Sequence, residues 1–139
     1  MEAMKRLYVN GGVLFCPFTV QGELERDFIL SDQAVPELTN IKPVSLGPSK
    51  SIDSLTDHLA RIIFDGGAYT RTLFSFEQAL DLASSLVEAI IRKRAADFCY
   101  WELGSHWSGW FFNIAWDYSF LVFDKGEKVV TLICMTDTD

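Results

Sequence analysis

The sequence predicts an α+β fold: an antiparallel sheet, built from an N-terminal hairpin and a C-terminal three-stranded meander, with two helices packed on one face. Three observations predict it. Runs rich in aromatic and β-branched residues lie toward both ends, two segments of helical periodicity lie between them, and turn-forming residues separate the runs. With 139 residues, 49% of them hydrophobic and 22% charged, the chain is predicted to be a single domain, 1–139.

The N-terminal hairpin is predicted from two apolar runs, Lys5 to Val9 and Val13 to Phe18, which flank Asn10-Gly11-Gly12. Asn-Gly favours the positive φ angles of a tight hairpin turn. Because Pro17 has no N–H to donate, its strand should lie at a sheet edge or end there. Glu25 to Leu30 is a further candidate strand.

The segment from Ser31 to Lys50 has a different character, with three prolines among polar residues and isolated apolar ones. A loop of this length inside a compact domain is uncommon and often functional, which makes the segment a candidate binding loop. Alternatively, Ile41 to Leu46 forms a short edge strand. The sequence leaves both interpretations open.

Two helices are predicted in the middle of the chain. The first, Ser51 to Phe64, has apolar residues on one face, its own first serine as a cap, and Gly66-Gly67 as its stop. The second runs from Ser75 to about Ala96 and begins with a capping box, a serine followed three residues later by glutamine. The basic run Arg92-Lys93-Arg94 suits the C-terminal end of that helix.

The predicted meander consists of Trp110 to Trp116, Tyr118 to Asp124 and Lys128 to Thr136. Asp124-Lys125-Gly126-Glu127 is the expected turn between the last two strands, with glycine at the left-handed position. In the first strand, alternation assigns one set of side chains to the core face: Trp110, Phe112, Ile114 and Trp116.

The net charge of -7 comes from 19 carboxylates against 12 lysines and arginines. This balance repels phosphates, so we expect no nucleic-acid partner. It suits a basic protein partner, since opposite fields speed encounter, although solubility alone would also account for it. Cys16, Cys99 and Cys134 lie far apart in apolar surroundings, as reduced thiols of a cytoplasmic protein do. We find no signal peptide and no apolar run of the ~20 residues that span a membrane, so no membrane association is expected.

Motifs for catalysis and for metal binding are weak. Gly104 to Gly109 gathers two serines and a histidine, but it lacks the Gly-x-Ser-x-Gly pattern and is better interpreted as a turn. The two histidines of the chain form no metal-binding pair. Asp137 and Asp139 alternate on a strand and share a face that would suit calcium, but such a terminus is more often simply solvated. We therefore expect no enzyme, no metal and no cofactor.

All four tryptophans lie between Phe98 and Phe123, among many other aromatic residues. Two interpretations stay open. The rings fill an unusually aromatic core, or some of them are exposed beside acidic residues and contact another protein, because exposed tryptophan and tyrosine give large contact area at low entropic cost.

The stretch from Trp110 to Asp124 and the ending Thr136-Asp137-Thr138-Asp139, in a small acidic α+β chain, resemble the immunity proteins of bacterial polymorphic toxin systems. The resemblance implies a bacterial protein without catalytic residues that binds a cognate toxin domain and occludes its active site. It implies a protein partner, most simply a basic toxin domain. We expect the chain to be a monomer or a weak dimer.

The partner contacts that we expect combine acids for charge with rings for anchoring: Trp101, Glu102, Trp107, Asp117, Tyr118, Asp137 and Asp139. Two other functions stay open. One is a phage-encoded inhibitor that blocks a bacterial defence enzyme by imitating nucleic-acid charge. The other is a small-ligand domain with an aromatic-lined pocket, in which His106 and Asp117 converge.

Overall fold

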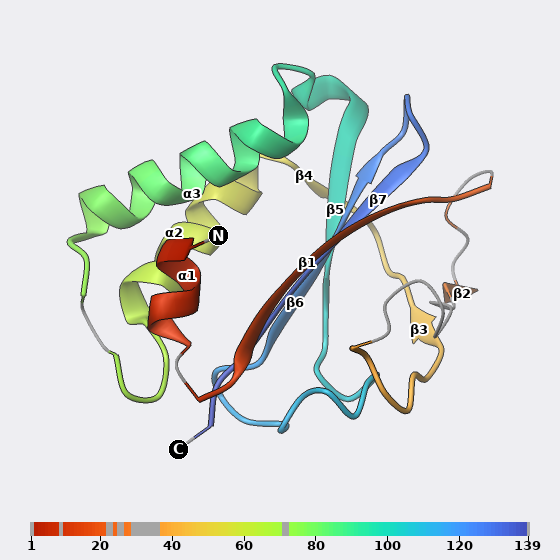
Figure 1. Ribbon diagram of the computed structural model, residues 1–139. Helices are drawn as coiled ribbons and strands as arrows, with labels where there is room; N and C mark the ends of the chain where they lie inside the picture. The colour runs from red at the N-terminus through yellow and green to blue at the C-terminus, as the bar shows by residue number, and fades with distance from the viewer. Residues whose placement is uncertain are drawn as a thin grey trace.

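The computed structural model describes residues 2–8, 10–21, 24, 27–28, 37–70 and 73–138. A five-stranded antiparallel sheet carries helices on one side (Figure 1), which confirms the predicted α+β fold with two helices on one face. The elements in chain order are α1 (Glu2–Leu7), β1 (Gly12–Thr19), β2 (Asp27–Phe28), β3 (Val44–Ser45), β4 (Lys50–Ser51), α2 (Asp53–Asp65), α3 (Phe76–Ile91), the 3-10 turn η1 (Ala95–Asp97), β5 (Phe98–Leu103), β6 (Tyr118–Asp124) and β7 (Val129–Thr136).

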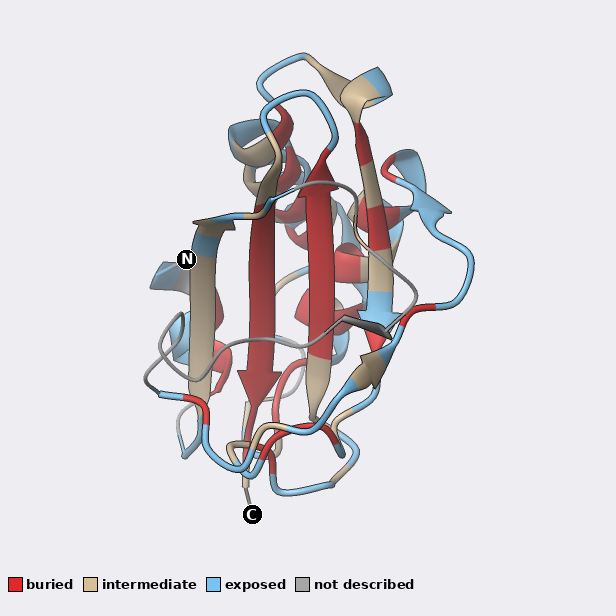
Figure 2. Cartoon of the chain, turned by 90° about the vertical axis from the view of Figure 1, so that its right-hand side faces the viewer, coloured by how far each residue is buried: buried red, intermediate tan, exposed pale blue. Residues whose placement is uncertain are grey.

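The sheet has the strand order β1-β7-β6-β5-β4, and β2 pairs with β3 in a separate two-stranded ribbon. The first long strand therefore lies beside the last one, with Gly12 opposite Thr136 and Thr19 opposite Val129. In Figure 2, the interior strands β6 and β7 are buried along almost their whole length, whereas β1 at the edge is only half-buried.

Side chains alternate strictly between the two faces of the sheet, as the pleat requires. On β6, Phe120 and Val122 face the core beneath the helices, and Leu121 and Phe123 face the opposite side. The second face is covered by chain segments that include Leu38, Leu46, Trp107 and Phe111. Because both faces are apolar, the interior strands are almost continuous hydrophobic runs.

The predicted N-terminal hairpin is wrong. Residues 2–7 form the helix α1, and β1 pairs with β7 instead of with the segment before it. Met4, Leu7 and Tyr8 are the buried residues here, and their spacing of three and four is the helical period. Asn10-Gly11 connects α1 to β1. The expectation that Pro17 marks an edge strand is confirmed.

Both predicted helices are confirmed, with shifts at their ends. Ser51 belongs to β4, and α2 begins after Ile52 without a side-chain cap, so the predicted serine cap is wrong. Gly66 ends α2 with a positive φ of 75°. The capping box of α3 is present as predicted. This helix ends at Ile91 rather than near Ala96, because Arg92 adopts a left-handed conformation.

The strand predicted from Trp110 to Trp116 is wrong, and β5 takes its place in the meander. The assigned alternation is wrong at one pair, since Phe111 is 4% exposed and Phe112 is 56% exposed. The other side chains assigned to the core, Trp110, Ile114 and Trp116, are half-buried. Asn113 has a positive φ of 60°, and the Asp117 carboxylate accepts a hydrogen bond from the Ile114 N–H at 3.0 Å. These local contacts hold the segment in turns, so it presents no strand edge.

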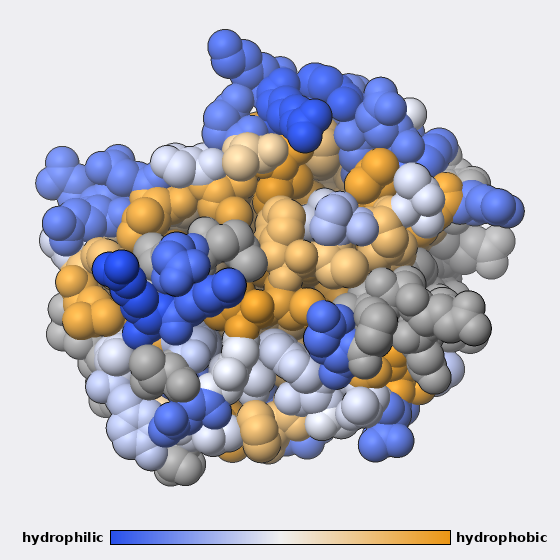
Figure 3. All heavy atoms as spheres, in the orientation of Figure 1, coloured by the Kyte–Doolittle hydropathy of each residue, from blue (hydrophilic) through white to orange (hydrophobic). Residues whose placement is uncertain are grey.

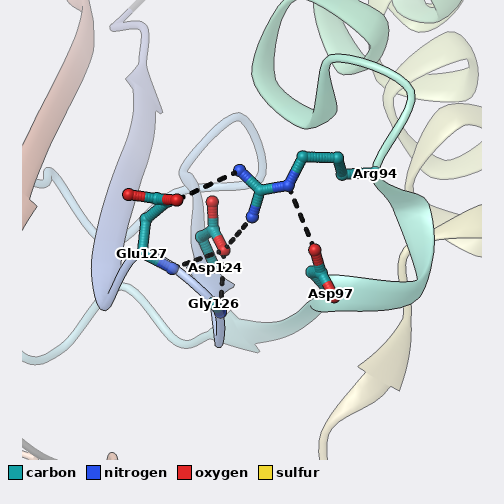
Figure 4. A network of polar contacts seen from close by, with 5 residues as sticks. All are labelled: Arg94, Asp97, Asp124, Gly126 and Glu127. Carbon is teal, nitrogen blue, oxygen red and sulfur yellow. Dashed lines mark hydrogen bonds and ion pairs between the residues drawn. The ribbon is translucent and has the colours of Figure 1, made fainter.

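The β6–β7 hairpin lies where predicted, but its left-handed residue is Lys128, with φ 55°, and not Gly126. The turn is organised by Asp124, whose Oδ1 accepts hydrogen bonds from the N–H groups of Gly126 and Glu127, both at 3.0 Å. Arg94 donates to the same oxygen at 2.7 Å and to Asp97 at 3.0 Å (Figure 4). The basic run after α3 thus fastens the helix to the hairpin.

Within the segment from Ser31 to Lys50, residues 31–36 lie outside the described residues. The candidate strand at Ile41 to Leu46 is present only as β3, which pairs with β2. The strand expected from Glu25 to Leu30 corresponds to β2 at Asp27–Phe28, and its flanking residues are not described.

Candidate functional site

The two tryptophans expected to anchor a partner form hydrogen bonds within the chain, and one of them is buried. Trp107 is 5% exposed, and its Nε1 donates to Ser119 Oγ at 3.1 Å. Trp101 is half-buried, and its Nε1 donates to the carbonyl of Gly47 at 2.8 Å. Their indole N–H groups are therefore satisfied within the chain, and Trp107 has no ring surface left for a partner. This corrects the expectation for Trp107.

The expected acidic contacts are also engaged in internal bonds. Glu102 is exposed but forms an ion pair with Lys50 at 3.0 Å, and His58 Nε2 lies 3.7 Å from its Oε1. The hydrogen bond to Glu102 raises the pKa of Lys50. Asp117 accepts hydrogen bonds from Ile114 and from the Thr136 hydroxyl. Tyr118 is half-buried, and this burial raises its pKa, with a further contribution from Asp65.

Asp137 is a structural carboxylate, which corrects its expected role as an exposed charge. It is fully buried, and its two oxygens accept hydrogen bonds from the N–H groups of Asn10 at 3.0 Å and Ala68 at 2.8 Å. It thus joins the end of β7 to the turn before β1 and to the α2–α3 connection. Asp139 lies outside the described residues.

The Gly104–Gly109 turn does not assemble a catalytic set. Ser108 donates its hydroxyl to the carbonyl of Thr39 at 2.9 Å, and Ser105 contacts Asn113 at 3.3 Å. His106 is exposed and borders a shallow pocket of about 300 Å³, away from the hydrogen-bonded carboxylate of Asp117. In the described part of the chain, no group of three histidine, cysteine or carboxylate ligands is placed to hold a metal ion.

The acidic excess of the chain is concentrated in α2 and α3. These helices carry six of the 19 carboxylates but one of the 12 lysines and arginines, so the rest of the chain is almost balanced. All seven charged side chains are exposed. The members of this acidic helical face are Asp53, Asp57, Arg61 and Asp65 on α2, with Glu77, Asp81 and Glu88 on α3.

The spacing of these residues places them in two stripes. On α2 they recur every four residues, and on α3 Glu77 and Asp81 are four apart and Glu88 follows seven later. Residues at such spacings share one side of a helix. Since both helices bury their other side in the core, each stripe points away from the core.

Three large apolar side chains are exposed at one end of the acidic helical face. Tyr69 and Leu73 lie in the α2–α3 connection and are 57% and 53% exposed. Phe76 opens α3 at 45% exposed, with one ring edge against Phe64 at a centroid distance of 5.8 Å. We call Tyr69, Leu73 and Phe76 the apolar tip. Asp65 and Glu77 flank it along the chain.

A groove of about 580 Å³ lies between the C-terminal half of α3 and β1. Its walls include Phe15 and Pro17 from the strand and Ala89 and Ile90 from the helix, and Arg92 borders it where the helix ends. In the view of Figure 3, hydrophobic residues gather in the middle of this side of the molecule, between α3 and β1.

The sequence signal for the charge stripes is the spacing of four residues between carboxylates within the two predicted helices. Within the described residues, no helix is both long and apolar enough to cross a bilayer. No protein family model, curated protein or solved structure matches this chain.

Proposed function

We propose that this chain is a non-catalytic binding protein that neutralises a basic protein partner through the acidic helical face. In its specific form, the proposal is that of an immunity protein that covers the active site of a cognate bacterial toxin domain. The observation that carries it is the concentration of the acidic excess in two exposed stripes with an apolar tip at their end.

The two parts of this surface have different tasks in binding. Unpaired surface carboxylates steer a basic partner and raise the association rate, with a strong dependence on salt. No described ion pair involves a carboxylate of the acidic helical face, so these charges remain available. Exposed rings and aliphatic side chains desolvate on contact and slow dissociation. The apolar tip therefore replaces the tryptophans as the expected anchor.

The test is complex formation with the toxin encoded beside this chain, measured by surface plasmon resonance at several salt concentrations. Asp81→Lys should lower the association rate about tenfold at low salt, since it reverses one steering charge. Its matched control is Glu37→Lys, which reverses an exposed carboxylate outside the two helices. Tyr69→Ala should raise the dissociation rate about tenfold. Its control is Phe112→Ala, because Phe112 is equally exposed in the β5–β6 connection.

If no neighbouring gene product binds at submicromolar concentration, the immunity assignment fails. If a partner binds but Asp81→Lys and Glu37→Lys behave alike, the acidic helical face is not the contact.

The same stripes also favour a second function, inhibition of a nucleic-acid-binding enzyme by charge imitation. This alternative predicts that the chain competes with DNA for the enzyme. A complex with a toxin that does not bind nucleic acid would exclude it.

A further inference from the structure

Within the described residues, no strand pairs with the outer edge of β1, and the register of β1 shows which of its residues point toward that edge. In an antiparallel pair, alternate residues bond to the neighbouring strand and the others point away from it. Val20 donates to the carbonyl of Lys128 at 2.9 Å, in register with the β1–β7 ladder, so the even-numbered residues bond to β7. The backbone groups of Val13, Phe15, Pro17 and Thr19 therefore point outward.

Among the described residues, none forms a backbone hydrogen bond with these outward groups outside the β1–β7 ladder. Pro17 lacks an N–H, which removes one donor from the edge. Such a row of unpaired donors and acceptors is a template for one more strand. The backbone of another extended segment can form hydrogen bonds with these outward groups.

The groove beside β1 supplies side-chain contacts for such a segment. The odd-numbered residues of β1 face the helices, and Phe15 and Pro17 form the wall of the groove opposite Ala89 and Ile90 of α3. A strand added at the edge would place every second side chain into this groove. Recognition by strand addition combines these two elements, a backbone edge and slots for alternate side chains.

The charged residues at the groove indicate the chemistry of one side chain on the added strand. Arg92 is exposed, borders the groove, and has no ion pair with a described carboxylate. Arg94, in contrast, is held by Asp97 and Asp124, and these hydrogen bonds raise its pKa. Glu127 also lines the groove, but it lies 4.0 Å from Arg94, so Arg92 is the cation left for a carboxylate on the added strand.

We propose that β1 and this groove bind an extended segment of a partner protein, which pairs with β1 as a sixth strand, inserts apolar side chains beside Phe15 and Ala89, and places a carboxylate at Arg92. A second copy of this chain fits less well. Two β1 edges in antiparallel pairing would each bring a proline without an N–H, and both molecules carry a net charge of -7. The inference does not rest on the proposed function, because it concerns a different surface.

The test titrates the full chain, observed by NMR, with a blocked heptapeptide in which threonine and valine alternate and one valine is replaced by aspartate. We expect saturable binding and slower amide exchange at Val13, Phe15 and Thr19. A peptide with a central proline should bind at least about tenfold more weakly, since it lacks a ladder hydrogen bond.

Variants of the chain separate the backbone contribution from the side chains. Thr19→Pro removes an outward N–H while the even-numbered bonds to β7 remain, and it should weaken peptide binding severalfold, whereas Thr19→Ala should not. Ala89→Trp fills the groove and should abolish binding, whereas Ser84→Trp, at an exposed position outside the groove, should not. Circular dichroism melts confirm that each variant folds.

The proposed ion pair between Arg92 and the aspartate of the peptide is tested by reversing its charge. Arg92→Glu should reverse the preference of the chain for the aspartate peptide over a lysine peptide. Lys93→Glu should leave that preference unchanged, because Lys93 is exposed, also has a positive φ, and does not border the groove.

Three results would overturn the proposal: no saturable binding at millimolar peptide, equal binding of the proline peptide, or a groove variant that binds normally. Concentration-dependent dimerisation that Thr19→Pro abolishes would assign the edge to a second copy instead.

Discussion

Asp137 joins three parts of the chain that are far apart in the sequence. It binds backbone N–H groups of Asn10 and Ala68, which belong to the turn before β1 and the α2–α3 connection. Two glycines make room for this arrangement. A Cβ at Gly67 would overlap Asp137 Oδ2 and the carbonyl of Leu7, and one at Gly11 would overlap the carbonyl of Thr136. These positions require the absence of a side chain.

Gly67→Ala should therefore destabilise the protein by at least about 2 kcal/mol, since the new methyl group must displace either backbone or the buried carboxylate. Gly47→Ala is the matched control, because nothing lies within 4 Å of a Cβ there, and its unfolding free energy should change by less than about 1 kcal/mol. Urea unfolding measures both. Equal stability of the two variants would contradict the crowding at Gly67.

Tyr8 has a buried hydroxyl without a hydrogen-bond partner among the described residues. Burial raises its pKa above the ordinary value of 10.0, with contributions from Tyr118 and Asp137. A raised folded-state pKa means that the unfolded tyrosine ionises first. The part of the unfolding free energy that depends on protonation of Tyr8 is therefore fully present below pH 10.0, and it is lost as the pH rises above that value.

Tyr8→Phe should raise the unfolding free energy at pH 7 by about 1 kcal/mol, because it removes an unsatisfied polar group from the core. The variant should also lose less stability than the parent between pH 9 and 11, since its ring does not ionise. Urea titrations across that range test both effects. Tyr69→Phe alters an exposed ring and is the control. A destabilised Tyr8→Phe would show that the hydroxyl is satisfied in solution.

At the level of elements, the predictions that depend on a few neighbouring residues are confirmed. The capping box of α3 and the stop of α2 follow from two or three neighbouring residues, and both are present. The helix α1 was mistaken for a strand, because over its six residues alternation and helical spacing are hard to distinguish. β5 was missed because its alternation competes with the denser aromatic run from Trp110 to Trp116, which is held in turns by Asp117.

Ser75→Ala should cost about 1 kcal/mol of stability, because it removes the side-chain oxygen that accepts from Gln78 N–H at 3.2 Å. Ser84→Ala, at an exposed interior position of the same helix, should be neutral or slightly stabilising, since alanine has the higher helix propensity. Thermal melts of the two variants measure the difference. If both shift equally, the capping box contributes nothing.

At the level of the whole molecule, tertiary packing exposes acidic and apolar side chains at other positions than the sequence predicts. Acids and exposed rings were expected to meet a partner, and the structure brings such groups together on α2, α3 and the apolar tip. The expected residues differ because exposure is decided by tertiary packing. Trp107 is covered by the sheet, and Asp137 is enclosed by two glycine turns.

Concentrating like charges on two helices also costs stability. Glu77 and Asp81 lie four residues apart, so they repel each other. Asp81→Lys should stabilise the chain by about 0.5 kcal/mol at low salt, while it weakens partner binding. Raising the salt should increase the melting temperature of the parent more than that of the variant. A parent protein whose melting temperature falls with salt would contradict this prediction.

The pairing of β1 with β7 also determines when the sheet can form during synthesis. β7 lies inside the sheet, between β1 and β6, although among the described strands it comes last in the sequence. Asn10 and Asp137, which close this end of the molecule, are 127 positions apart. On the ribosome, β1 and β6 must therefore wait, with their apolar faces uncovered, until β7 leaves the exit tunnel. We therefore expect the nascent chain to expose apolar strand surface until β7 has been synthesised.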